Sequence, residues 1–147
     1  MQTVPLDSVQ TALDAAYAQE KKAFGFYDGE KAVVLTLKDT AVMGELLPHL
    51  SPVSQQLDVT VLHTLVLERL FGIDKENMAN QTNLTYTRDA KEAIDAVNNG
   101  DTDCCFLLNP TRVSEIRDVA AAGEKMPQKS TYFYPKLITG LTVNKIL

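Results

Sequence analysis

The stretch FGFYDGEKAVVLTL, residues 24–37, decides the fold class of this chain. Its two runs, 24–27 and 31–37, are rich in the aromatic and β-branched residues that favour strands. Asp28 and Gly29 stand between the runs, and this dipeptide tolerates the positive φ angles of a tight turn. The stretch therefore predicts a β-hairpin, whose antiparallel strands begin a sheet.

Apolar spacing predicts a helix on either side of the hairpin. Before it, one face of a helix over 7–22 carries Val9, Leu13, Ala16 and Tyr17. After it, Asp58 is placed to cap a helix over 58–70, and Gly72 stands where a left-handed C-cap residue is expected. Apolar residues almost encircle this second helix, so it is predicted to be the central helix of the core.

The rest of the chain alternates between helical and extended patterns. Helices are expected at 42–47, 90–97 and 113–120, with a connector at 75–80. Strands are expected at 84–86, 103–108, 130–134 and 138–143. The unbroken apolar run 103–108 is typical of an interior strand buried on both faces. This order of elements predicts an α/β (α+β) fold, with a mixed sheet, a β-hairpin and packed helices.

Length and charge narrow the classes of function. With 147 residues and 45% hydrophobic content, the chain suits a single compact domain over 1–147, in which a helix within 1–23 precedes a core over 24–147. The net charge of -5 disfavours binding to a phosphate backbone, so nucleic acid is not expected as a partner. No apolar run approaches the roughly 18 residues that span a bilayer, and no signal-peptide pattern is present. The sequence therefore predicts a cytoplasmic protein without a membrane partner, and it leaves the oligomeric state open.

Cys104 and Cys105 are adjacent within the apolar run 103–108. Neighbouring cysteines form a disulfide only with a strained backbone, and these two lack the spaced His or Cys partners of a zinc site. We therefore expect buried, reduced thiols, no metal and no cofactor.

The run MPQKSTYFYPK, residues 126–136, holds the densest group of anion-recognising side chains. Lysine ammonium groups beside hydroxyl groups are suited to phosphate or carboxylate recognition. The candidate ligand-binding residues of this run are Lys129, Ser130, Tyr132, Tyr134 and Lys136. The alternative is a half-buried strand whose tyrosines pack in the interior and whose lysines reach into water.

Continued by 137–141, this run resembles the C-terminal signature of the DUF1015 family, to which no reaction is assigned and whose members are sometimes labelled ParB-like. The resemblance extends to 57–63 together with 70–73, and to 106–111. Members of the family have a substantial further N-terminal region. The resemblance therefore implies that this chain is the C-terminal part of a longer protein, with that N-terminal region as a partner of the domain.

His63 is the candidate catalytic residue. It shares a helix face with Val59, Val66 and Leu70, so an apolar environment is expected around it. A desolvated imidazole stays neutral, which suits it to transferring one proton near neutral pH. The alternative is a core histidine that is hydrogen-bonded to a carbonyl.

Asn109 and Thr111 are further candidates for ligand binding. They lie in a turn after the run 103–108 and before the helix predicted at 113–120. Helix N-termini present unpaired N–H groups, so a turn of this kind is suited to holding an anion. The alternative is that both residues only cap the helix.

Three functions stay open at this point. The first is binding or processing of a small anionic molecule, a phosphorylated metabolite included, in a pocket where Lys129, Ser130, Lys136 and Thr111 converge near His63. The second is a regulatory or protein-interaction module, which the lack of a recognisable nucleophile–base pair favours. The third is a ParB-like nucleic-acid-associated protein, and the acidic balance counts against it. Whether the protein is an enzyme is left open.

Overall fold

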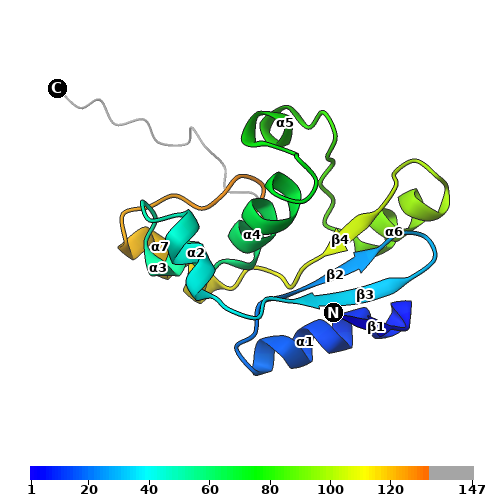
Figure 1. The fold of residues 1–147 in the computed structure, drawn as a ribbon, viewed down its shortest axis with the longest axis horizontal. Helices are drawn as coiled ribbons and strands as arrows, with labels where there is room; N and C mark the ends of the chain where they lie inside the picture. The colour runs from blue at the N-terminus through cyan, green and yellow to red at the C-terminus, as the bar shows by residue number, and fades with distance from the viewer. Residues whose placement is uncertain (133–147) are drawn as a thin grey trace, which may run out of the picture.

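Four strands form one antiparallel sheet in the computed structural model of the chain, which describes residues 1–132. They are β1 Gln2–Val4, β2 Ala23–Tyr27, β3 Ala32–Thr36 and β4 Cys105–Leu107. Within the described residues the strand order is β1-β3-β2-β4, and every neighbouring pair runs antiparallel (Figure 1). Helices pack on both faces of this sheet, so the predicted α/β (α+β) class with packed helices is confirmed, but within the described residues the sheet is antiparallel and not mixed as predicted.

The hairpin predicted at 24–37 is confirmed as β2 and β3. The two strands pair in the register that places Tyr27 opposite Ala32. In the loop between them, Oδ1 of Asp28 accepts a hydrogen bond of 2.8 Å from the backbone N–H of Lys31. Gly29 has a φ of +91°, which side chains rarely allow. Asp28 therefore closes the turn with its side chain, and Gly29 supplies the backbone angle.

One face of the sheet is covered by α1 and α6. A 3-10 turn at Leu6–Ser8 leads into α1 Val9–Ala18, and α6 spans Ala90–Asn98. Val9 and Leu13 are fully buried between α1 and the sheet. Gly25 of β2 permits this close packing, because a Cβ atom there would lie 2.5 Å from Cγ1 of Val9. The helix predicted at 90–97 is confirmed, and the helix predicted at 7–22 is confirmed in part, because α1 ends at Ala18.

The other face packs against a second group of helices. These are α2 Ala41–Leu46, α4 Asp58–Val61 with its continuation, and α5 Lys75–Asn80. Beside them, α3 Pro52–Gln55 packs against α7 Val113–Ala121. The connector predicted at 75–80 is wrong, because this segment is α5. Asp74 caps it by accepting a hydrogen bond of 2.8 Å from the backbone N–H of Asn77, a capping signal that the sequence contains.

The central helix predicted at 58–70 begins as α4 and then widens into a π-helix over Leu62–Glu68. Leu62 is buried and Leu67 is 2% exposed, as predicted for a core helix. Leu70, however, is 76% exposed. A π turn holds more residues than an α turn, so the spacing of 3.6 residues that predicts a buried Leu70 fails there. Gly72 has the expected left-handed conformation, with a φ of +69°.

The prediction of an interior strand at 103–108 is wrong for the described part of the chain. There, β4 is an end strand of the sheet and pairs with β2 alone. Its side chains are half-buried, with Leu107 against one core and Phe106 against the other. The helices on both faces of the sheet bury the apolar side chains of this strand, so a second neighbouring strand is not needed to explain the apolar run.

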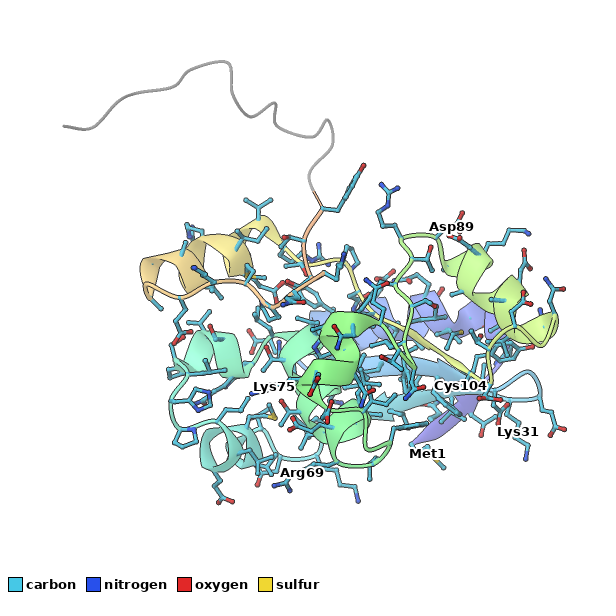
Figure 2. The ribbon with its side chains drawn as sticks, turned by 90° about the horizontal axis from the view of Figure 1, so that it is seen from above. Met1, Lys31, Arg69, Lys75, Asp89 and Cys104 are labelled. Carbon is cyan, nitrogen blue, oxygen red and sulfur yellow. The ribbon has the colours of Figure 1, made fainter. Side chains whose placement is uncertain are left out.

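The two cysteines are free thiols, as predicted, but they are half-buried instead of fully buried. Figure 2 shows Cys104 at the same end of the molecule as Lys31 of the hairpin loop. Burial raises the pKa of both thiols. At neutral pH this keeps them in the protonated, less reactive form.

Two further predicted strands are not found where the structure describes the chain. Residues 84–86 are irregular, because Leu84 packs into the second core without a neighbouring strand. Residues 130–132 do not form the start of a strand either. The rest of the strand predicted at 130–134, and the strand predicted at 138–143, lie outside the described residues.

Candidate functional site

The first part of the signature run, residues 126–132, forms a turn. Oγ of Ser130 donates a hydrogen bond of 2.6 Å to the carbonyl of Pro127. Lys129 has a φ of +58° and is exposed. A serine that bonds to its own local backbone competes with strand pairing, which accounts for the missing strand at 130–132. Tyr134 and Lys136, the remaining candidates of this run, lie outside the described residues.

The structure brings Thr111 and Ser130 together. The Thr111 hydroxyl donates a hydrogen bond of 2.7 Å to the carbonyl of Ser130. The helix after this turn, α7, has Arg112 as its N-cap residue, so Thr111 lies outside the helix. The Arg112 N–H donates to Oε2 of Glu115 at 2.7 Å. This bond occupies one of the backbone N–H groups at the start of α7, which the sequence analysis expects to be free to hold an anion.

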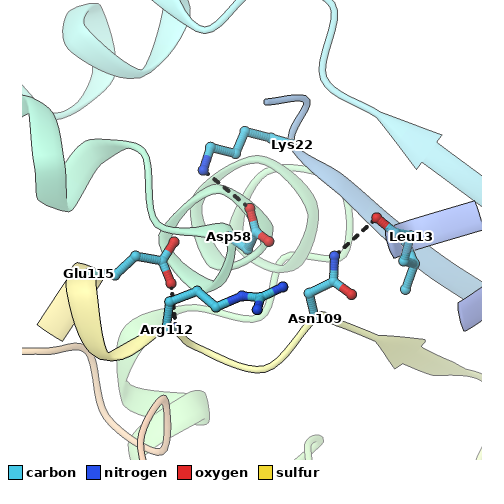
Figure 3. Close-up of polar contacts among 6 residues, drawn as sticks. All are labelled: Leu13, Lys22, Asp58, Asn109, Arg112 and Glu115. Atoms are coloured by element: carbon cyan, nitrogen blue, oxygen red, sulfur yellow. Dashed lines mark hydrogen bonds and ion pairs between the residues drawn. The ribbon is translucent and has the colours of Figure 1, made fainter. Parts of the chain in front are cut away.

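Asn109 lies elsewhere, between the turn and α1. It is 9% exposed, and its Nδ2 donates a hydrogen bond of 3.1 Å to the carbonyl of Leu13 (Figure 3). Its Oδ1 accepts a bond of 3.0 Å from Nε2 of Gln10. Asn109 therefore does not cap α7, whose N-cap residue is Arg112; both polar atoms of its side chain instead attach the turn to α1.

His63 lies in the π-helical segment and is half-buried. Burial lowers the pKa of its imidazole, which favours the neutral form at pH 7. Its ring packs against Tyr86, with the ring centroids 6.4 Å apart and an angle of 61° between the planes. Both observations agree with the desolvated imidazole that the sequence predicts, whereas Leu70, expected on the same face, is exposed.

Arg88 is a residue of this region that the sequence analysis missed. Its Cζ lies 3.9 Å from the centroid of the Tyr132 ring, which is a cation–π geometry. Arg88 follows Tyr86 by two residues, so the segment 86–88 contacts His63 at one end and Tyr132 at the other. Arg88 carries no periodic signal because it stands in an irregular segment, and only its proximity to Tyr132 makes it a candidate.

Fold and site together define a class: an α+β domain with an antiparallel sheet between two layers of helices and a polar surface around Arg88 and Tyr132. Comparisons of this chain with protein-family models, curated proteins and solved structures found no match. The resemblance to the DUF1015 family therefore stays a prediction. Within residues 1–132, no three His, Cys, Asp or Glu side chains are grouped so as to hold a metal ion. In the same part of the chain, every helix is too short or too polar to cross a membrane.

Proposed function

We propose that the domain binds a small anionic molecule, with a phosphate or carboxylate group, on the surface where the signature run meets the segment 86–88. The observation that carries the proposal is the guanidinium of Arg88 at 3.9 Å from the Tyr132 ring. Stacking uses the flat face of a guanidinium and leaves the N–H donors at its edge for a planar bidentate bond to an anion. The contact with Tyr132 thus favours one orientation of the Arg88 guanidinium before any ligand binds.

Lys129 supplies the second positive charge of this surface. It lies one residue before Ser130, whose carbonyl is fixed by Thr111, so the backbone around Lys129 is anchored. His63 takes the role of proton donor or acceptor at the Tyr86 end of the segment. Since burial keeps the imidazole neutral, His63 contributes proton transfer and not charge to anion binding.

Calorimetric titration with inorganic phosphate and with ribose 5-phosphate tests this proposal. Arg88→Met and Lys129→Met keep much of the aliphatic stem and remove the charge, so each is expected to weaken binding by about tenfold or more. Lys38→Met is the matched control, because Lys38 is exposed in the loop between β3 and α2. Equal affinity in wild type, Arg88→Met and Lys129→Met would show that this surface does not hold the anion.

A second candidate function, as a protein-interaction module, is favoured by Leu70 and Phe71. These neighbouring side chains are 76% and 49% exposed at the end of the π-helical segment. Adjacent exposed apolar side chains of this size are typical of contact surfaces. Sedimentation of wild type and Leu70→Gln over a range of concentrations tests for pairing with a second copy. A mass that rises with concentration in wild type alone would support this function.

A further inference from the structure

A pocket of about 310 Å³ shares no lining residue with the signature run. It opens between α3, the start of α7 and the residue that precedes β2. One part of its wall is apolar and the other part is polar and charged. The lining residues are Pro52, Val53 and Leu57 on the apolar side, and Lys22, Gln56 and Glu115 on the polar side.

Lys22 is held in this wall by Asp58. Its Nζ lies 3.5 Å from Oδ1 of Asp58, and the two side chains are only 16% and 14% exposed (Figure 3). An ammonium group has three N–H donors, so a contact with Asp58 leaves donors for a ligand in the pocket. Lys22 thus offers an oriented positive charge at one position of the wall.

Asp58 is poorly compensated for a buried carboxylate. Within the described residues, its buried Oδ1 has no hydrogen-bond donor, since the contact with Lys22 at 3.5 Å is too long for a well-formed hydrogen bond. Burial raises the pKa of Asp58, the Lys22 ammonium lowers it, and the Glu115 carboxylate raises it further. An incompletely compensated buried ion pair beside a pocket is one of the features that mark a candidate binding site.

Glu115 supplies the opposite charge in the same pocket. Its Oε2 accepts the hydrogen bond of 2.7 Å from the Arg112 N–H, which fixes the carboxylate while Oε1 stays available. The Arg112 guanidinium does not cancel this charge within the pocket, because its Cζ stacks at 4.3 Å from the centroid of the Tyr17 ring. The pocket therefore presents one positive group and one negative group beside an aliphatic wall.

We propose that this pocket binds a small aliphatic zwitterion, an amino acid with a hydrocarbon side chain. The ligand carboxylate contacts Lys22, its ammonium group contacts Glu115, and its side chain packs on Pro52, Val53 and Leu57. Glu115 repels a simple anion and Lys22 repels a simple cation, so charge complementarity selects a ligand that carries both signs. A volume of about 310 Å³ is at the small end of the usual range for ligand pockets, as an amino acid requires.

Three probes of equal hydrocarbon size separate the contributions to binding. Leucine carries both charged groups, 4-methylpentanoate has only the carboxylate, and isoamylamine has only the ammonium group. Calorimetric titration of the wild-type chain at pH 7 is expected to show binding of leucine. Each of the other two probes should bind about tenfold or more weakly, because each lacks one charged contact.

Two variants locate the site. Glu115→Gln removes the charge but keeps an amide oxygen that can still accept the Arg112 N–H, so α7 stays capped while leucine binding falls by about tenfold or more. Lys22→Met should also weaken leucine binding by about tenfold or more. The double variant Lys22→Met with Asp58→Asn should do the same without leaving the Asp58 carboxylate buried and unpaired. Asp58→Asn alone keeps Lys22 and removes the competing carboxylate, so it should bind leucine at least as tightly as wild type. Glu45→Gln and Lys38→Met are the matched controls, since both residues are exposed and outside the pocket.

Each outcome decides the proposal. Selective leucine binding that falls in Glu115→Gln and in the Lys22 variants, but not in the controls, supports it. Absence of leucine binding by wild type, equal binding of leucine and 4-methylpentanoate, or full binding by folded Glu115→Gln overturns it. Phosphate binding at the signature run is measured separately with Lys129→Met, so failure of either proposal leaves the other standing.

Discussion

The ammonium group of Lys22 lies 3.5 Å from the carboxylate of Asp58, and this ion pair links the sheet to the helix α4. Lys22 directly precedes β2, and Asp58 is the first residue of α4, which packs in the second core. The backbone carbonyl of Lys22 also accepts a hydrogen bond of 2.9 Å from the N–H of Leu37, just beyond β3. The charged end of Lys22 therefore projects from a backbone that the sheet holds in place.

Lys22→Met is expected to destabilise the domain by about 3 kcal/mol, because it leaves the Asp58 carboxylate buried without its partner. The double variant with Asp58→Asn should regain most of that loss, since it removes the unpaired charge as well. Urea unfolding followed by circular dichroism measures both. Lys91→Met is the control: its pair with Asp95 is exposed and screened by solvent, so it should lose far less stability than Lys22→Met. Equal losses in Lys22→Met and Lys91→Met would show that the Lys22–Asp58 pair contributes little.

Asp58 also predicts a dependence of stability on pH. Its pKa is raised in the folded state, chiefly by burial, so the folded protein binds the proton more tightly than the unfolded chain does. Stability therefore falls as the pH rises from about 4, the usual pKa of an aspartate, through the raised pKa of Asp58. Asp58→Asn should match wild type below pH 4 and become the more stable of the two at pH 7. Unfolding free energies of both proteins across pH 3.5–7.5 provide the measurement, and a constant difference would contradict it.

The sequence predicts those features whose signal is local. The hairpin follows from Asp28 and Gly29 in the loop, and α6 follows from its apolar spacing between Asp89 and Gly100. By contrast, Leu70 is exposed because the helix widens into a π-helix before it. A run of apolar residues does not indicate where a π-helix will form. The sequence also does not predict that β4 lies at the end of the described sheet. An apolar run can be buried by helices as well as by neighbouring strands, so it does not reveal the position of a strand in the sheet.

The candidate site was predicted less completely than the fold. The pairing of Thr111 with Ser130 agrees with the expected convergence of the two segments, whereas Asn109 bonds to α1. Arg88 at the signature run, and Lys22, Asp58 and Glu115 at the pocket, are not predicted as site residues, because at each place the side chains come from separate segments that only folding brings together. Charged residues without a shared spacing carry no signal of proximity in a single sequence.

A second polar cluster, formed by Ser51, Ser54 and Glu124, attaches the end of α7 to α3. The Glu124 carboxylate accepts hydrogen bonds from the Ser51 N–H at 2.7 Å, from the Ser51 hydroxyl at 2.8 Å and from the Ser54 hydroxyl. Ser54→Ala is expected to cost about 1–2 kcal/mol, since it removes a bond from a buried hydroxyl to a charged acceptor. Ser114→Ala on the exposed face of α7 is the control, with a change within about 0.5 kcal/mol.

These bonds also lower the pKa of Glu124, with the Ser54 hydroxyl as the largest cause. The carboxylate therefore stabilises the fold above its usual pKa of 4.5, and this contribution is lost as the pH falls through the lowered pKa. Glu124→Gln should lose less stability than wild type on acidification from pH 5 to pH 2.5. Parallel acid-unfolding curves for the two proteins would mean that the cluster makes no net contribution.

Gly25→Ala tests the close packing of α1 on the sheet. The new Cβ would lie 2.5 Å from Cγ1 of Val9 and 3.1 Å from Cβ of Leu107, so α1 or its side chains must shift. Overpacking of this kind is expected to cost about 1–3 kcal/mol. In the double variant with Val9→Ala the clash with Cγ1 is gone, so the two losses should be less than additive.

Gly44→Ala in α2 is the matched control: the nearest atom is 3.6 Å away, and alanine favours a helix, so stability should stay constant or rise by up to about 1 kcal/mol. Thermal and urea unfolding of wild type, Gly25→Ala, Val9→Ala, the double variant and Gly44→Ala decide the point. If Gly25→Ala is as stable as Gly44→Ala, α1 does not pack on β2 as closely as described.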